Sequence, residues 1–251
     1  MTTHVYLSPH FDDAVLSCGA LIHRQTRAGE RVVVLTVCAG VPPAGPLSDF
    51  AQALHARWGV TAEAVRATRQ TEDQTALRRL GAEAHYLAVP DCIYRRAPET
   101  LAFLYASEEA LFGPMAPAEQ ALSHALAAQL AAWLTAWPAV QGYLPLGIGQ
   151  HVDHQLTRLA AEQLPQAWLY YEDYPYAARV PETPAWAGLA SQMRAHPLAV
   201  EDQDIEAYCQ AVADYRSQVS SFWPDEAAMR AALREFCVRA GRPEVRLWAR
   251  S

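Results

Sequence analysis

Two short stretches of the chain hold side chains whose types and spacing could do chemistry. They are His10, Asp12 and Asp13 in the first stretch, and His151, Asp153 and His154 in the second. The adjacent carboxylates of Asp12 and Asp13 repel each other, so they need a cation, helix N-terminal amides or a shared proton nearby. His151 and His154 are three residues apart and share one face of a helical turn. Imidazoles and carboxylates in this pattern are the ligands of a metal site.

The elements around each stretch place both at the end of a strand. The apolar residues 4–7 predict a short strand before the first stretch, and helical spacing predicts a helix over 15–28 after it. Residues 140–146 predict a strand before the second stretch, followed by a helix that begins near His151. The carboxyl ends of parallel strands meet at one edge of a sheet. Either histidine of the second stretch alone would more often be structural, but we expect the two stretches to converge.

The rest of the chain alternates strand-like and helix-like segments. The β-branched run 31–38 is typical of a parallel strand covered on both faces. Further strands are predicted over 84–89, 167–171 and 244–248, and helices over 50–58, 61–80, 116–137, 205–221 and 225–240. This alternation predicts an α/β fold: a Rossmann-like three-layer αβα sandwich with a mostly parallel sheet, in a single domain spanning 1–251.

Composition limits the class of protein. The chain has 251 residues, of which 51% are hydrophobic, enough for one large domain with a substantial core. No apolar run reaches membrane-spanning length and the first residues lack a signal-peptide pattern, so we expect a cytoplasmic protein. The net charge of −7 offers no basic footprint for nucleic acid. Five scattered cysteines predict buried thiols rather than disulfides or a thiolate metal site. Assembly into a homo-oligomer is left open.

Both stretches resemble known motifs. Pro9-His10-Phe11-Asp12-Asp13, followed by a helix, and His151-Val152-Asp153-His154 resemble the two signature motifs of the PIG-L or LmbE-like family of zinc-dependent N-deacetylases, which act on N-acetylated sugars. The segment 69–81 is similar to a helix of that family, and 215–218 shows a weaker likeness. The family's first motif commonly ends in Glu, where this chain has Ala14. We expect this departure to remove a carboxylate near the pocket mouth and to affect which sugars are accepted.

The resemblance implies roles for individual residues. It makes His10, Asp13 and His154 the zinc ligands and Asp12 the general acid/base. His151 would stabilise the oxyanion, with Asp153 fixing its ring. Two imidazoles and one carboxylate also leave a coordination position open for water, as a catalytic zinc site requires. The implied activity is removal of an N-acetyl or N-acyl group from an amino sugar or glycoconjugate.

The resemblance also suggests residues that contact the substrate. The resemblance makes Arg69 and Asp91 candidates for binding substrate, Asp91 because it falls where the family carries a further acidic residue. For Arg69, the other interpretation is a solvated position on the face of its helix, or an ion pair with a helical neighbour such as Glu72 or Asp73. The tyrosine-rich segment 170–176 follows a predicted strand, so it could offer rings to a carbohydrate at the same edge, or simply pack.

Two other classes of function remain open on the residues alone. Two histidines and one carboxylate also form the ligand set of a mononuclear non-haem iron enzyme. A non-catalytic module that binds a divalent metal and phosphate could use the Asp12–Asp13 pair. The alternating βα pattern argues against the iron oxygenase, and the lack of any lysine argues against the phosphate module. Metal analysis would distinguish all three.

Overall fold

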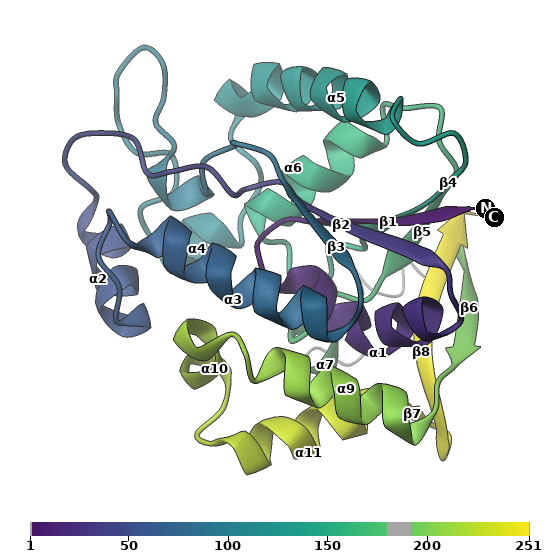
Figure 1. The fold of residues 1–251 in the computed structure, drawn as a ribbon. Coiled ribbons are helices and arrows are strands. Elements are labelled where there is room, and N and C mark those ends of the chain that lie inside the picture. Colours follow the sequence, from purple (N-terminus) through teal and green to yellow (C-terminus); the bar gives the residue numbers. More distant parts are fainter. Residues whose placement is uncertain (1, 180–191, 251) are drawn as a thin grey trace.

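The computed structural model describes residues 2–179 and 192–250. A central sheet lies between two layers of helices, which confirms the predicted three-layer α/β fold (Figure 1). The strand order is β3-β2-β1-β4-β5-β8-β6, and the short β7 pairs with β8. The strands are β1 Thr3–Ser8, β2 Arg31–Thr36, β3 Glu83–Tyr86, β4 Val140–Pro145, β5 Trp168–Tyr171, β6 Met193–Ala199, β7 Val238–Arg239 and β8 Arg242–Arg250.

The first five strands are parallel, and their order reverses direction beside β1. β1 pairs with β2 on one side, with Val5 opposite Val33, and with β4 on the other, with Val5 opposite Gly142. The crevice between β1 and β4 is therefore the topological switch point, where open α/β sheets bind ligands. β1 is buried on both faces, which explains its continuous apolar run.

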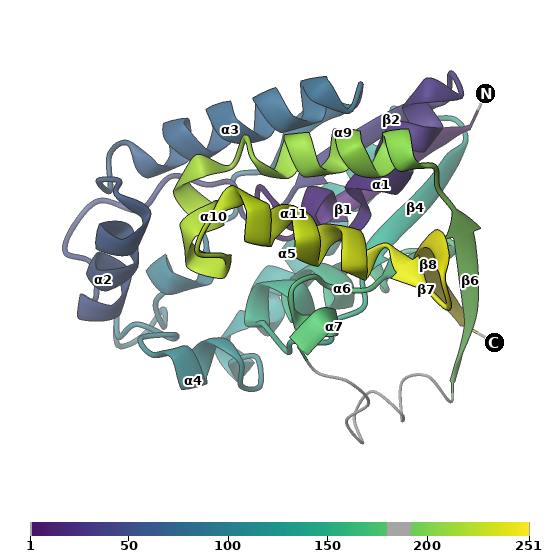
Figure 2. The same cartoon turned by 90° about the horizontal axis from the view of Figure 1, so that it is seen from below.

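Helices cover both faces of the sheet. α5 and α6 lie on one face, whereas α1, α3 and α9 lie on the other, with α11 packed against α9 (Figures 1 and 2). Two hydrophobic cores result, one on each face. The helices are α1 Asp13–Arg27, α2 Asp49–Trp58, α3 Val65–Arg79, α4 Glu108–Leu111, α5 Gln120–Leu134, α6 Val152–Ala161, α7 Tyr176–Arg179, α9 Asp202–Val212, α10 Arg216–Phe222 and α11 Glu226–Phe236, with 3₁₀ turns η1 Cys92–Tyr94 and η2 Pro117–Glu119.

The C-terminal third differs from the sequence prediction in three places. One is the helix expected over 225–240, which ends at Phe236 and is followed by β7. The helix expected over 205–221 is interrupted after Val212, and α10 starts a new direction at Arg216. Tyr215 lies at the break, fully buried, and its hydroxyl donates to Asp73 of α3 at 2.8 Å. β6 was not predicted; it is an antiparallel edge strand, where Pro197 is tolerated because an edge needs fewer backbone donors.

Two expectations from composition can be compared with the described residues. Among them, no helix is both long enough and apolar enough to cross a membrane. All five cysteines are free and buried, as predicted.

Asp73 makes the stability of the fold depend on pH. Its carboxylate is fully buried between the hydroxyls of Tyr86 and Tyr215, and burial raises its pKa to about 7. An aspartate in the unfolded chain ionises near pH 4. Between these values the unfolded chain loses the proton that the folded protein keeps, so the free energy of unfolding falls as the pH rises towards 7 and then levels off.

Asp73→Asn should remove this dependence, since the amide fills the same space without ionising. Relative to the wild type, the variant should gain about 2 kcal/mol in the free energy of unfolding between pH 5 and pH 8. Urea unfolding of both proteins at both pH values measures the difference. The exposed Glu226→Gln serves as a control. A difference between wild type and Asp73→Asn that does not change with pH would contradict the assignment.

Candidate metal centre and active site

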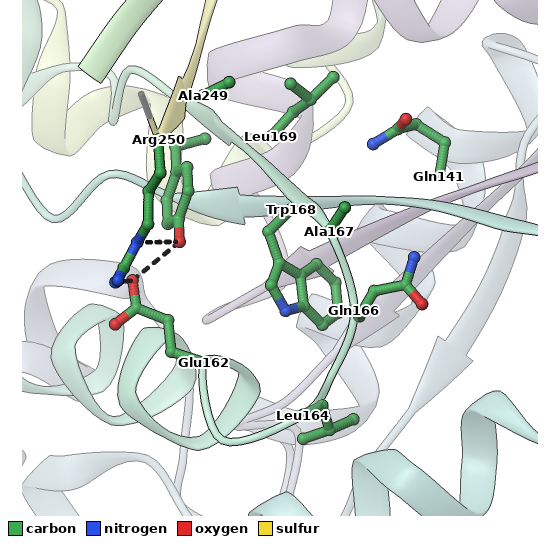
Figure 3. Close-up of a pocket in the computed structure, with 10 residues that line it drawn as sticks. Gln141, Glu162, Leu164, Gln166, Ala167, Trp168, Leu169, Ala249 and Arg250 are labelled. Atoms are coloured by element: carbon green, nitrogen blue, oxygen red, sulfur yellow. Dashed lines mark hydrogen bonds and ion pairs between the residues drawn. The ribbon is translucent and has the colours of Figure 1, made fainter. Parts of the chain in front are cut away.

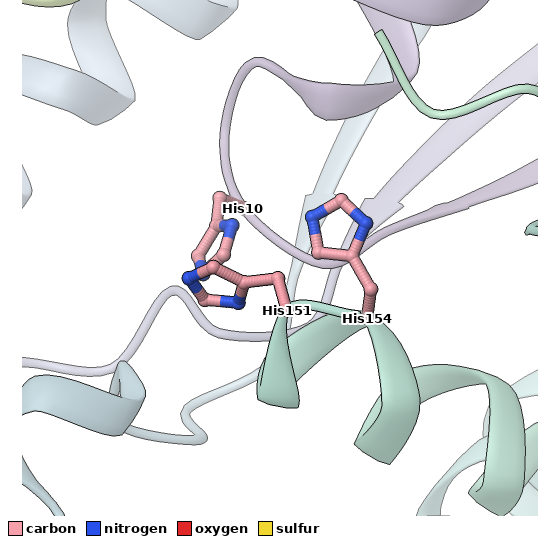
Figure 4. Close-up of side chains that lie close together, drawn as sticks. All are labelled: His10, His151 and His154. Atoms are coloured by element: carbon pink, nitrogen blue, oxygen red, sulfur yellow. The ribbon is translucent and has the colours of Figure 1, made fainter. Parts of the chain in front are cut away.

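The two predicted stretches meet at the switch point. His10 lies in the loop after β1 and Asp13 begins α1, whereas His151 and His154 lie at the start of α6, beyond the end of β4. Figure 4 shows the three imidazole rings gathered from these two segments. The ring centroids of His10 and His151 are 4.8 Å apart, and those of His10 and His154 are 5.7 Å apart. The expected convergence is confirmed.

The turn after β1 is shaped by Ser8. Its hydroxyl accepts the Ala14 N–H at 3.0 Å and donates to the His10 carbonyl oxygen at 2.5 Å. These bonds fold the chain sharply between the strand and α1. The Asp13 carboxylate stabilises the same turn by accepting the backbone N–H of His10 at 2.7 Å. As a result, the His10 and Asp13 side chains point to one place.

The loop after β4 is held by Asp173, which follows β5. One oxygen of this carboxylate accepts the N–H of Gly147 at 2.6 Å and that of Ile148 at 3.1 Å. Gly147 has a φ of +81°, which few other residues adopt readily. Gly149 is needed for a different reason, because a Cβ there would lie 2.3 Å from the ring of Tyr176. The loop can therefore bring α6 close to the end of β1.

Hydrogen bonds to carboxylates fix the proton positions on two of the histidines. His10 Nε2 donates to Asp153 at 2.9 Å, and His154 Nδ1 donates to the other oxygen of Asp173 at 2.5 Å. A neutral imidazole with one N–H has a lone pair on its other nitrogen. The nitrogens left to bind a metal are His10 Nδ1 and His154 Nε2. Carboxylate partners of this kind orient metal-binding histidines in many proteins.

Asp13 lies between these two nitrogens. Its Oδ2 atom is 3.0 Å from His10 Nδ1 and 3.3 Å from His154 Nε2. Ligand bonds of 2.0–2.1 Å in a tetrahedral zinc site separate the ligand atoms by about 3.3 Å, so each of these two distances is compatible with a pair of ligand atoms on one zinc ion. His154 Nε2 is also buried without a hydrogen-bond partner among the described residues. A buried polar atom of this kind calls for a partner such as a metal ion.

His151 differs from these two histidines, because the lone pair of its other nitrogen is already used. Its Nδ1 atom accepts the backbone N–H of Asp153 at 3.2 Å, which leaves its proton on Nε2. Burial lowers the pKa of His151 well below its usual value, and His10 lowers it further, so the ring stays neutral. Ligand atoms of His10, His151 and His154 lie within 4.8 Å of one another, so the three could form a metal-binding group. With its proton on Nε2, however, His151 serves better as a hydrogen-bond donor than as a ligand.

The role expected of Asp153 needs correction. The sequence prediction had its carboxylate fixing the ring of His151. In the structure its backbone N–H does so, and the carboxylate accepts from His10, Cys92 N and Arg95 instead. The reason is geometric, since Asp153 lies in the first turn of α6 and its side chain points back under the loop after β1.

The charges around the centre support one another. Burial opposes ionisation of Asp13, but His154 and His10 face it and hold its pKa well below the usual range. Burial likewise lowers the pKa of His10, yet Asp13, Asp153 and Asp91 together raise it well above normal. The imidazoles and the carboxylates therefore stabilise each other's charged forms at this place.

Asp12 and Arg69 form a second buried pair beside this centre. Arg69 Nη2 donates to Asp12 Oδ1 at 3.1 Å, and its guanidinium lies against the rings of Phe11 and Trp58. Arg69 is only 7% exposed. The alternative of an ion pair with Glu72 is wrong, because Glu72 accepts from Ser217 instead. Burial raises the pKa of Asp12 above the usual value, and Arg69 opposes the rise.

A cavity of about 300 Å³ opens over these groups. Its polar floor includes Asp12, Arg69 and Asp91, the last of which also caps η1 by accepting Ile93 N–H at 3.2 Å. Its walls are apolar and come from α2, the end of α4 and α10: Phe50, Leu54, Trp58, Leu111, Phe112 and Phe222. The cavity therefore places one charged region next to one apolar region.

The tyrosine-rich segment divides between the two roles considered for it, whereas Ala14 is placed differently from the prediction. Of the tyrosines, Tyr176 lines the cavity, whereas Tyr170, Tyr171 and Tyr174 are buried in the cores. Ala14 belongs to the first turn of α1, is 1% exposed and packs in the core. It does not line the cavity, so the expected loss of a carboxylate at the cavity mouth is wrong.

A second cavity, of about 360 Å³, lies at the opposite edge of the sheet, beside the amino ends of β4 and β5 (Figure 3). Its charged groups pair with each other: Arg250 contacts Glu162 at 2.6 Å and the Tyr170 hydroxyl at 3.2 Å. These charges are neutralised within the wall, so we place the chemistry in the first cavity.

Sequence reasoning missed three residues that hold the centre. Asp173 could have been found, because it lies just beyond a strand end, as Asp91 does. Arg95 and Glu119 could not, since they come from a loop and a 3₁₀ turn without a recognisable motif.

Comparison with known proteins agrees with this site. Residues 5–164, more than half of the chain, match the PIG-L family, described as GlcNAc-PI de-N-acetylase. The chain belongs to the PIG-L family. This PIG-L protein is 28% identical over 201 residues to 2′-N-acetylparomamine deacetylase of Niallia circulans. That alignment covers 68% of this chain and 66% of the relative, just under two thirds of its length.

Solved structures of similar proteins extend the likeness over the whole chain. The zinc-inhibited form of teicoplanin deacetylase Orf2 is 28% identical, with a TM-score of 0.84, and the match covers 100% of this chain and 99% of that one. The A40926 pseudoaglycone deacetylase Dbv21 is also 28% identical, with a TM-score of 0.77 and coverage of 99% and 96%. Our PIG-L protein thus shares its fold with deacetylases from end to end.

Proposed function

We propose that this protein is a zinc-dependent hydrolase that removes an N-acetyl or longer N-acyl group from an amino sugar or glycoconjugate. The observation that carries the proposal is the placement of Asp13 Oδ2 between His10 Nδ1 and His154 Nε2, at 3.0 and 3.3 Å. These three atoms converge beside a cavity whose floor also contains Asp12 and His151. Membership of the PIG-L family supports the same reaction class.

The ligand atoms suit zinc. Two neutral imidazole nitrogens and one carboxylate oxygen leave one tetrahedral position for water or substrate. A zinc ion held by His10, Asp13 and His154 would supply a water of lowered pKa, about 7, and Lewis-acid polarisation of the amide carbonyl. The protein's own residues then have to move a proton and stabilise charge.

Asp12 is the group placed to move the proton. Its Oδ1 atom is held by Arg69 at 3.1 Å, so the carboxylate cannot turn freely. We assign it as the base that accepts a proton from the attacking water and then returns it to the leaving amine. Such general acid/base catalysis contributes about 10²–10⁴-fold to a rate. Asp12 faces the same cavity as the ligands, which is the geometry this role needs.

His151 is the group placed to stabilise the oxyanion. Its neutral ring carries the proton on Nε2, because Nδ1 accepts from the Asp153 backbone. A fixed N–H donor aimed at the developing charge lowers the barrier without having to reorganise. His151 lines the cavity and is 7% exposed, so water competes little for this donor.

The cavity supports a substrate with one polar and one apolar part. The floor offers Arg69 and Asp91 to sugar hydroxyls, and the six apolar wall residues suit a bulky apolar group attached to the sugar. Two similar deacetylases act, by their names, on teicoplanin and on a pseudoaglycone. Another acts on an N-acetylated paromamine. We therefore expect an N-acylated amino sugar that carries an apolar aglycone.

A panel of paired substrates tests this specificity. N-acetyl and longer N-acyl amino sugars, each with and without an apolar aglycone, are screened for release of free amine beside ester, phosphomonoester and peptide controls. We expect the sugar amides to be cleaved best, and those with an aglycone to have the lower KM, because the apolar walls desolvate it. Turnover of a peptide or phosphoester, with no amine released from any sugar, would disprove the proposal.

The other two classes of function receive less support. The parallel α/β sheet and PIG-L membership favour hydrolysis over the iron oxygenase. A phosphate-binding module would not explain why His151 and His154 lie at the same site. Zinc, rather than iron, should therefore be the metal that co-purifies with the active protein.

A further inference from the structure

Arg95 occupies a buried position between two carboxylates. It follows η1, its side chain is 6% exposed, and its guanidinium donates to Asp153 on one side and Glu119 on the other. Nη1 also donates to the Pro90 carbonyl oxygen at 3.2 Å, and Nη2 to Glu119 Oε2 at 3.2 Å. All three nitrogens of the guanidinium are therefore engaged, and its orientation is fixed.

Glu119 is itself held in place. The Tyr105 hydroxyl donates to Glu119 Oε2 at 2.6 Å and accepts the Ala116 N–H at 2.8 Å. Glu119 lies in η2, just before α5, and is 2% exposed. The helix layer over one face of the sheet thus anchors the far side of Arg95.

Asp153 connects Arg95 to His10 through hydrogen bonds. One of its oxygens receives Arg95, and the other receives His10 Nε2 at 2.9 Å and Cys92 N at 3.0 Å. Cys92 N and Arg95 can only donate, so Asp153 acts as an acceptor and the proton between it and His10 lies on His10 Nε2. His10 Nδ1 is then the nitrogen left to bind a metal, on the side where Asp13 Oδ2 lies 3.0 Å away.

We infer that Arg95 and Glu119 are positioning residues for the metal ligand His10. They hold Asp153 so that it selects the His10 tautomer with Nδ1 free for coordination. The inference rests on the proposed zinc centre and adds two residues that act on His10 through Asp153. The simpler alternative is that Arg95 only neutralises two buried carboxylates. That alternative predicts a loss of stability with no change in zinc affinity.

Zinc affinity of folded Arg95 variants separates the two explanations. In chelator competition, Arg95→Met should bind zinc about 10–100-fold more weakly than the wild type, the usual effect of losing a partner of a metal-binding histidine. The zinc affinity of Arg95→Lys should lie between those of the wild type and Arg95→Met. Lys keeps a positive charge at Asp153 but lacks the planar guanidinium that also donates to Glu119. Glu119→Gln should show a smaller loss of the same kind.

Asp204→Asn is the matched control. Asp204 is a fully buried carboxylate on α9 that pairs with His23 and Arg27, away from the metal centre. Its loss should reduce the free energy of unfolding while leaving zinc affinity unchanged. The ring ¹⁵N spectrum of the zinc-loaded protein gives a second readout, with His10 protonated on Nε2 in the wild type and altered in Arg95→Met.

Unchanged zinc affinity in the folded Arg95 variants would overturn the inference. If Arg95→Met fails to fold, Arg95→Lys and Glu119→Gln decide in the same way. These results also separate the inference from the proposed function. Should His154→Ala lose zinc while the Arg95 variants keep it, only the positioning role fails. Should His154→Ala keep zinc, the proposed centre itself fails.

Discussion

Asp12→Asn should abolish most of the turnover while leaving the metal centre intact. The amide has the size of the carboxylate and can still accept from Arg69, so the pair seen at 3.1 Å should persist. It cannot, however, accept a proton from water. We expect kcat to fall by about 10²–10⁴-fold, with zinc content and KM close to those of the wild type.

Steady-state kinetics and metal analysis of the same preparation check this result. Asp202→Asn, an exposed aspartate at the start of α9, is the control for the substitution itself. If Asp12→Asn lost its zinc while Asp13→Asn kept it with a pure turnover defect, the two aspartates would have exchanged roles. Near-normal activity in both variants would place the active site elsewhere.

His154→Ala should remove the metal and all activity that depends on it. The substitution deletes the ligand atom Nε2 and also leaves Asp173 without its imidazole partner at 2.5 Å. Asp13→Asn should be milder, because a neutral amide oxygen replaces an anionic ligand. We expect its activity to recover partly at high zinc concentration, whereas His154→Ala should not recover.

Zinc content after dialysis and activity across a zinc titration measure both effects. His124→Ala, an exposed histidine on α5, should bind zinc and work like the wild type. Full metal occupancy in His154→Ala, or unchanged activity after thorough chelation, would show that the ligand set is wrong. Reactivation by cobalt would not contradict the ligand set, since such sites accept several divalent ions.

The features that the sequence predicted well are those with a strong local signal. β1, β2 and β4 are largely buried and appear as apolar runs, and α1 and α6 begin within the chemical stretches, at Asp13 and Val152. Because parallel strands share one edge, the positions of the two stretches at strand ends were enough to predict that they converge. The edge strand β6 has alternating exposure and a proline, so it gave no comparable signal.

Features set by distant contacts could not be predicted in this way. The break before α10 depends on Tyr215 reaching Asp73, 142 residues away. The contact between Asp153 and His10 spans 143 residues, and a residue in the first turn of a helix can reach partners on several sides. Arg95 joins Asp153 to Glu119 only because the loop after β3 passes under α5. Such contacts follow from the packed fold and leave no local pattern.

The two halves of the proposed metal centre come from loops on either side of the switch point. An ion bound there ties the end of β1 to the start of α6, and only the folded chain offers both. Binding restricted to the native state stabilises it by about 4 kcal/mol when the free ion exceeds its Kd a thousandfold. Without the ion, these two loops should be the first segments that a protease can cut. The supply of metal would then set how long the protein survives as well as how fast it works.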